Sequence, residues 1–150
     1  MITQQPAIVQ EVAMEATPAA IFAALTDPAQ LVQWWGGDKY KVDRMDVDLR
    51  AGGAWRTEGT GGDGHAFAAF GVYRVIEPPH TLEYTWNYDW SDGDAVQTLV
   101  RFDISERGSG SLVRVTHTGF VDAEERSDHD QGWTLVLGWL HDYTARNRTA

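Results

Sequence analysis

The sequence contains no cysteine, which excludes disulfide bonds and thiolate metal sites. No apolar run approaches the ~20 residues that a membrane-spanning helix needs, so insertion into a membrane is not expected. The segment from Met1 to Pro6 has neither the basic start nor the apolar core of a signal peptide. Together these absences predict a cytoplasmic protein.

Basic residues are also scarce. The chain has 12 Lys and Arg against 22 Asp and Glu, a formal charge of −10, and its basic residues are scattered rather than gathered in a stripe. Proteins that bind nucleic acid normally present such a stripe, so no nucleic-acid partner is expected. The acidity is typical of a surface that keeps a protein soluble.

Motifs for cofactors and metals are weak. The glycine-rich loop 59–64 is not followed by a helical pattern, so it does not predict phosphate binding, and no cofactor is expected. His129 stands between Asp128 and Asp130 where a helix is predicted to begin, and acidic residues there suit the helix dipole without any metal. No metal site is therefore predicted.

The strongest pattern lies in the last thirty or so residues, 121–150. Trp133, Leu137, Leu140 and Thr144 recur at spacings of four, three and four, the period of a helix with one buried face. This long helix follows a strand-rich stretch. The simplest way to bury its apolar face is a curved sheet wrapped around it, and a gap between the two is a natural ligand pocket.

Two short helices are predicted near the N-terminus, after a first strand at Ile8–Met14. Thr17 followed by Pro18 is an N-cap followed by a favoured first helical residue, and Asp27-Pro28 repeats the signal. Gln30 occupies the position of a capping-box partner for Asp27.

The middle of the chain alternates between strands and turns. The alternation is clearest at 81–88, where Leu82, Tyr84, Trp86 and Tyr88 share one face. Tight turns between consecutive strands imply an antiparallel meander. The further strands are predicted at 42–49, 54–58, 65–76, 96–104 and 112–120, with a polar turn at 89–94. The sequence thus predicts an α+β fold in which a curved antiparallel sheet of six to seven strands surrounds the C-terminal helix.

Several short motifs in this order resemble a known family. Phe22 to Pro28 followed by Trp34-Trp35-Gly36 is similar to the N-terminal signature of the activator-of-heat-shock-protein-ATPase-like family, in its bacterial single-domain form, and Asp48 to Trp55 is similar to its strand–bulge–strand motif. The remaining matches are Gly71-Val72-Tyr73, Pro78-Pro79, Leu82 to Trp86, Thr116 to Phe120 and Gly132-Trp133. The family belongs to the START-like (SRPBCC) superfamily, whose members have a helix-grip fold.

The resemblance implies a single domain over residues 1–150 with a hydrophobic cavity between sheet and helix. The eukaryotic namesake stimulates a chaperone ATPase, but it carries an additional N-terminal domain. A chaperone-associated role for this chain would rest on analogy of fold.

The polar candidate for a binding site is His117. Alternation places it with Val113 and Val115 on the inner face, where a neutral imidazole could orient a ligand, act as a base, or simply be a hydrogen-bonded core residue. Trp133, preceded by Gly132 that would allow close approach, is expected on the helix facing it. The full set predicted to line the cavity is Trp55, Tyr73, Tyr84, Trp86, Phe102, His117, Trp133 and Leu137. For the aromatic members, ordinary core packing is the alternative.

Two further features have two interpretations each. Trp34-Trp35 could close the cavity mouth or anchor a short helix to the sheet. Leu135 and Trp139 lie away from the Trp133 face, so they either form a homodimer contact or lie under a loop or the N-terminal helices.

Three functions remain open at this point. The first is binding of a small apolar molecule, aromatic or lipid-like. The second is an enzyme that uses the same cavity, for which His117 with a tyrosine or Glu58 is the available acid–base pair; no catalytic residue is predicted. The third is a protein-interaction module that uses the outside of the sheet, which is predicted to be polar.

Overall fold

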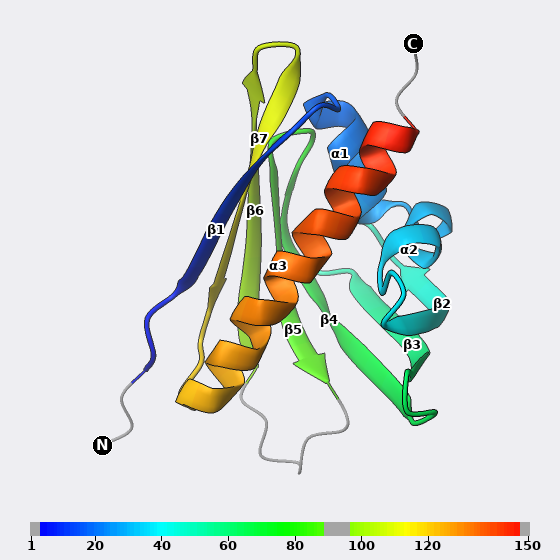
Figure 1. Ribbon diagram of the computed structural model, residues 1–150. Helices are drawn as coiled ribbons and strands as arrows, with labels where there is room; N and C mark the ends of the chain where they lie inside the picture. Colours follow the sequence, from blue (N-terminus) through cyan, green and yellow to red (C-terminus); the bar gives the residue numbers. More distant parts are fainter. Residues whose placement is uncertain (1–3, 89–96, 148–150) are drawn as a thin grey trace.

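A seven-stranded antiparallel sheet curves around one long helix in the computed structural model, which describes residues 4–88 and 97–147 (Figure 1). The order across the sheet is β1-β7-β6-β5-β4-β3-β2. The elements are β1 (Ile8–Met14), α1 (Pro18–Thr26), α2 (Pro28–Trp34), β2 (Tyr40–Val47), β3 (Ala54–Gly61), β4 (Ala66–Glu77), β5 (Thr81–Tyr88), β6 (Thr98–Arg107), β7 (Gly110–Thr118) and α3 (Ala123–Arg146). The predicted fold class, sheet and helices are confirmed.

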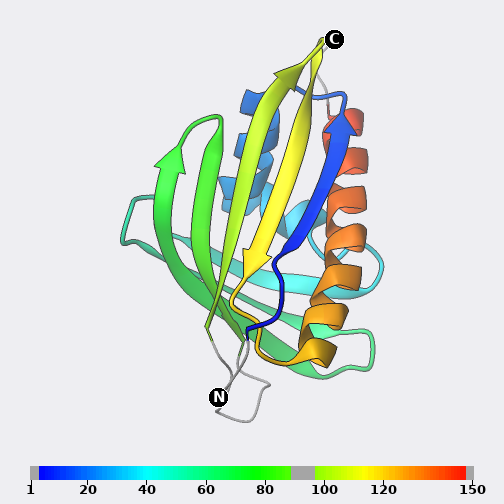
Figure 2. The same ribbon diagram turned by 90° about the vertical axis from the view of Figure 1, so that its left-hand side faces the viewer.

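The sheet is strongly twisted. Figure 2 shows β1, β7 and β6 running upright in front while β2 and β3 cross the far side. Helix α3 lies along the concave face, and α1 and α2 cover its C-terminal half (Figure 1). A cavity lies between the N-terminal half of α3 and strands β3, β4 and β5.

Both N-terminal helices begin where the sequence predicts. The Thr17 hydroxyl accepts a hydrogen bond from the Ala20 amide at 3.3 Å, and the Asp27 carboxylate accepts one from the Ala29 amide at 3.0 Å. The capping box differs in detail, because Gln30 bonds the Asp27 side chain at 3.3 Å and not its backbone N–H. The other end of the Gln30 amide accepts from Tyr143 at 3.1 Å, which joins α2 to α3.

Strand boundaries differ from expectation by a few residues. Strand β3 was expected to end at Glu58 but continues to Gly61, because Gly61 pairs with Tyr40 of β2 and Thr60 pairs with Ala66 of β4. The polar turn predicted at 89–94 and the start of the following strand at Val96 lie outside the described residues.

The core forms between the inner face of the sheet and α3. The helix buries the four residues whose spacing defined it, Trp133, Leu137, Leu140 and Thr144. The alternating set on β5 faces them, with Leu82 and Tyr84 buried against the register partners Phe102 and Val100 on β6. Within residues 4–88 and 97–147, no helix is long and apolar enough to cross a membrane.

Candidate functional site

Two adjoining cavities occupy the space between the sheet and the helices. The outer cavity, of about 780 Å³, lies between the N-terminal half of α3 and strands β3, β4 and β5, and the inner cavity, of about 40 Å³, lies between α1, α2 and strands β2 to β5. Trp35, Thr57 and Trp86 border both. The outer cavity has the volume of a typical small-molecule site, whereas the inner one holds a few water molecules at most.

The inner cavity has an apolar wall with phenol groups. Leu25, Leu31, Val42 and Met45 contribute aliphatic surface, and Trp55, Tyr73 and Tyr84 contribute aromatic rings. Burial raises the pKa of both tyrosines, so their hydroxyls stay protonated at any physiological pH. They can therefore donate or accept a hydrogen bond but cannot supply a phenolate.

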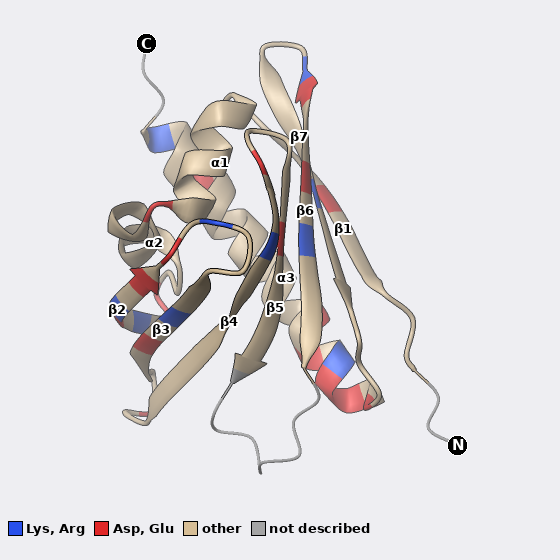
Figure 3. Cartoon of the chain, turned by 180° about the vertical axis from the view of Figure 1, so that it is seen from behind, with Lys and Arg blue, Asp and Glu red and all other residues tan. Residues whose placement is uncertain are grey.

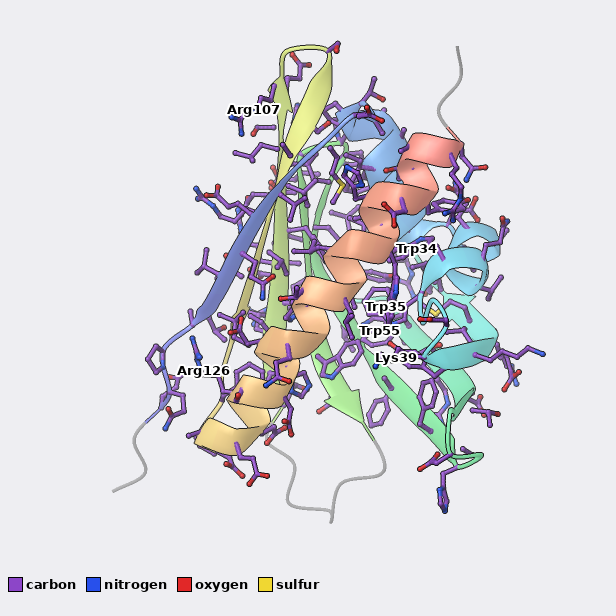
Figure 4. The ribbon with its side chains drawn as sticks, in the orientation of Figure 1. Trp34, Trp35, Lys39, Trp55, Arg107 and Arg126 are labelled. Carbon is purple, nitrogen blue, oxygen red and sulfur yellow. The ribbon has the colours of Figure 1, made fainter. Side chains whose placement is uncertain are left out.

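Trp34 and Trp35 have separate roles. The Trp34 ring is 2% exposed, donates its indole N–H to the Ala24 carbonyl at 2.9 Å and stacks on Tyr143, so it anchors α2. Trp35 is half-buried and donates to the Tyr40 hydroxyl at 2.7 Å. In Figure 4, Trp34, Trp35 and Trp55 lie one below another between α3 and strands β2 and β3. Trp35 borders both cavities and forms part of the wall between them.

The sequence-predicted aromatic residues divide between the two cavities. Trp86 stacks on Trp35 with ring centroids 6.3 Å apart, and Trp133 meets Trp35 edge-on at 6.2 Å. Trp133 and His117 border the outer cavity, whereas Trp55, Tyr73 and Tyr84 border the inner one. Trp86 belongs to both, so it is the predicted residue at which the two spaces meet.

Phe102 and Leu137 were also expected to line the cavity, but they lie behind it. Phe102 is fully buried, between the rings of Trp133 at 5.6 Å and Tyr84 at 6.4 Å, and Leu137 is 1% exposed. Neither is among the residues that border the two cavities. Alternation and helical spacing identified the buried face correctly, but they cannot separate a wall residue from the residue packed behind it.

His117 is completely buried, and both of its ring nitrogens have partners. The Trp133 indole N–H donates to Nδ1 at 2.9 Å, and Nε2 lies 2.7 Å from the Thr98 hydroxyl. Burial, with a smaller effect of nearby His129, lowers the pKa of His117 to about 3. The imidazole is therefore neutral near pH 7, and a ligand in the outer cavity finds no unused nitrogen on it.

The mouth of the outer cavity is acidic, which the sequence analysis did not predict. Among the described residues, no lysine or arginine lines the cavity. Lys39 directly precedes the lining residue Tyr40 but is not itself among the lining residues, and it lies on the exposed loop before β2. Figure 3 shows acidic residues gathered along the ribbon at the start of α3, with a basic residue among them. The carboxylates that border the cavity are Asp63, Asp122, Glu124, Glu125 and Asp128. The cluster of acidic residues at 122–130 is visible in the sequence, but a favourable interaction with the helix dipole explained it equally well.

Gly132 has a different role from the one expected. It was expected to let α3 approach the sheet closely, but a Cβ added there would meet no atom within 4 Å. Gly132 instead borders the outer cavity. The absence of a side chain at this position keeps the cavity open.

In the part of the chain that the structure describes, neither a metal-binding cluster nor a pairing of His117 with Glu58 is found. No set of three or more histidine and carboxylate side chains is placed to hold a metal ion there. Glu58, which with a tyrosine was one of the two expected partners of His117 in an enzyme, is 44% exposed and lies 3.4 Å from Arg56.

The comparison with family models settles the family. Residues 15–145 match the model described as "Activator of Hsp90 ATPase homolog 1-like protein". The chain belongs to this family. The resemblance noted from its motifs is thereby confirmed, and the AHSA1 fold is consistent with the START-like superfamily.

Solved structures have the same fold. The AHSA1 protein SPO3351 from Silicibacter pomeroyi is 28% identical, with a TM-score of 0.82 over 95% of this chain and 100% of that one. Protein CV1439 from Chromobacterium violaceum is 23% identical, with a TM-score of 0.82 over 92% and 96% of the two chains. CalU16 from Micromonospora echinospora is 23% identical, with a TM-score of 0.70 over 91% and 74%. The search of curated proteins gives no match.

Proposed function

We propose that this AHSA1-family chain is a binding protein for a small apolar molecule with an aromatic or lipid-like body, which it holds in the outer cavity. The observation that carries the proposal is an open volume of about 780 Å³ with an aromatic wall. Its rings come from five separate elements or loops of the fold, which predicts a preformed site rather than a chance surface groove. The aromatic lining residues are Trp35, Tyr40, Phe67, Trp86 and Trp133.

Binding is favoured over catalysis by the state of the polar groups. A general base works best with a pKa near the working pH, whereas the pKa of His117 is lowered to about 3 and its nitrogens are both hydrogen-bonded. The pKa values of Tyr73 and Tyr84 are raised, away from neutrality. The imidazole and phenol groups on which the enzyme hypothesis relied are therefore suited to lining a pocket and not to transferring protons near neutral pH.

The interaction-module hypothesis receives less support from the outside of the sheet. Charges there are largely paired with each other, as in Arg101 with Glu83 and Asp103, and Arg114 with Glu11. They alternate in sign along the strands in Figure 3 and form no single-sign field for a partner.

A cytoplasmic location stays a prediction from the sequence.

A matched pair of glycine variants on α3 tests the proposal. Gly132→Leu places a side chain in the outer cavity, while Gly138→Leu makes the same change at an exposed position of the same helix where a Cβ also meets no atom within 4 Å. Isothermal titration calorimetry with 2-acetylnaphthalene, an aromatic probe, is the measurement. Gly132→Leu should weaken binding by roughly five- to 150-fold, since overpacking costs ~1–3 kcal/mol, and Gly138→Leu should bind as the wild type does. Equal affinities in the two variants would place the probe elsewhere.

A further inference from the structure

Four of the six tryptophans that the structure describes donate their indole N–H to an acceptor in the protein. An indole N–H is a donor only, and buried donors in proteins nearly always have a partner. Four of the described tryptophans obey this rule, with the partners Ala24 O for Trp34, Tyr40 Oη for Trp35, Thr85 O for Trp55 and His117 Nδ1 for Trp133, at 2.9, 2.7, 3.2 and 2.9 Å.

Trp86 is the exception. Its Nε1 is buried, yet it has no hydrogen-bond partner among the residues that the structure describes. An unsatisfied buried donor costs on the order of 1–3 kcal/mol. The ring of Trp86 is fixed between Trp35 at 6.3 Å and Trp55 at 5.3 Å, and it borders both the inner and the outer cavity. The unused donor therefore belongs to the residue that joins the two spaces.

The hydrogen bonds that occupy both ring nitrogens of His117 continue to the backbone carbonyl of Trp86. The Trp133 indole bonds Nδ1 of His117, Nε2 of His117 bonds the Thr98 hydroxyl, and that hydroxyl bonds the Trp86 carbonyl at 3.4 Å. Thr98 is also the register partner of Trp86 across β5 and β6. These contacts fix where the indole stands while leaving its N–H without a partner.

We propose that the Trp86 indole N–H is the donor that orients the ligand, and that the ligand therefore carries a hydrogen-bond acceptor, such as a carbonyl oxygen, on its aromatic or apolar body. The proposal rests on the binding function proposed above and specifies the chemistry of its ligand. Trp86 takes the orienting role that was one of the three interpretations of His117 in the sequence analysis.

Nuclear magnetic resonance of the indole groups tests the donor directly. In ¹H–¹⁵N spectra of the full chain, the signal that disappears in Trp86→Phe is the Trp86 N–H. Without ligand it should lie upfield of the hydrogen-bonded indoles of Trp34, Trp55 and Trp133, and saturating 2-acetylnaphthalene should move it downfield. A signal already downfield in the free protein would mean that the chain or an internal water satisfies the donor, and would overturn the proposal.

A pair of probes separates this proposal from the binding function itself. 2-Isopropenylnaphthalene has nearly the shape of 2-acetylnaphthalene but replaces the carbonyl oxygen with a CH₂ group. By calorimetry, the ketone should bind wild type about two- to tenfold more tightly than the alkene, the value of one neutral hydrogen bond, and Trp86→Phe should abolish this preference. Trp34→Phe, which removes an indole whose N–H is bonded to the Ala24 carbonyl and which borders neither cavity, should keep it.

The two failures are distinguishable. If both probes bind wild type equally and Gly132→Leu blocks both, the cavity binds ligands but Trp86 does not orient them. If a ketone preference exists and survives Trp86→Phe, a different donor makes the contact. If neither probe binds, the binding function fails, and the orienting role of Trp86 fails with it.

Discussion

The indole N–H of Trp133 donates to Nδ1 of His117 at 2.9 Å, and this contact determines the tautomer of the histidine. Because an indole nitrogen cannot accept a hydrogen bond, Nδ1 must carry a lone pair, and the single ring proton must be on Nε2. Nε2 then donates to the Thr98 hydroxyl at 2.7 Å. The contact ties α3 to β7 and β6 through a neutral imidazole.

The first prediction concerns pH. The folded pKa of His117, about 3, lies below the ~6.5 of an unfolded histidine, so in the interval between them only the unfolded chain takes up this proton. The contribution of His117 to stability is therefore complete above pH ~6.5 and declines as the pH falls toward 3, by at most ~1.4 kcal/mol per pH unit. Urea unfolding of wild type and His117→Gln between pH 7 and 5 measures it, and the variant should show the smaller pH dependence. An imidazole that titrates near pH 6.5 in the folded protein would contradict the account.

The second prediction concerns the core stripe of α3. Leu137→Ala should lower the free energy of unfolding by ~2–5 kcal/mol, because Leu137 is 1% exposed and its removal leaves a cavity. Leu49→Ala is the control, the same change on the loop after β2 where the side chain is 43% exposed, and it should change stability by less than about 0.5 kcal/mol. Similar losses in the two variants, by urea unfolding, would mean that α3 does not bury the face assigned to it.

The third prediction concerns ligand charge. Five carboxylates border the outer cavity, so an anionic probe should bind more weakly than a cationic one of the same shape. Calorimetry with 2-naphthoate and 2-(aminomethyl)naphthalene at low salt measures the preference, which 1 M salt should reduce by screening. Asp128→Asn should reduce it as well, while Glu106→Gln, the same charge change at an exposed site near the β6–β7 turn, should not. A preference for the carboxylate would show that the acidic mouth does not set the ligand's charge.

The fourth prediction concerns assembly. A homodimer through Leu135 and Trp139 stays a prediction, with Leu135 exposed and Trp139 half-buried against Tyr40 at 5.9 Å. The Trp139 indole also lies close to Gly37, so Leu135 contributes most of the exposed apolar area of this pair. Sedimentation equilibrium at micromolar concentration should give a dimer mass for wild type and a lower mass for Leu135→Glu. A wild-type mass of 16.7 kDa would remove the dimer.

The fold was largely predictable because its signals are local. Thr17-Pro18 and Asp27-Pro28 mark helix starts within a few residues, and the periods of α3 and β5 are visible in single segments. The site was predictable only in part, because it depends on contacts between distant residues. His117 on β7 contacts Thr98 on the neighbouring strand β6 and Trp133 on α3. No spacing in the sequence shows that both ring nitrogens of His117 are hydrogen-bonded. The unpaired N–H of Trp86 is likewise visible only when the partners of the other indoles are known.

Native mass spectrometry of freshly purified protein tests the central claim most directly, because it requires no choice of probe. If the outer cavity binds a small molecule, wild type should carry an additional small mass that is released on activation, Gly138→Leu should carry it too, and Gly132→Leu should carry much less. The central claim is contradicted if the wild type retains such a mass and Gly132→Leu retains it to the same extent, or if none of the three proteins carries one before or after incubation with cell extract.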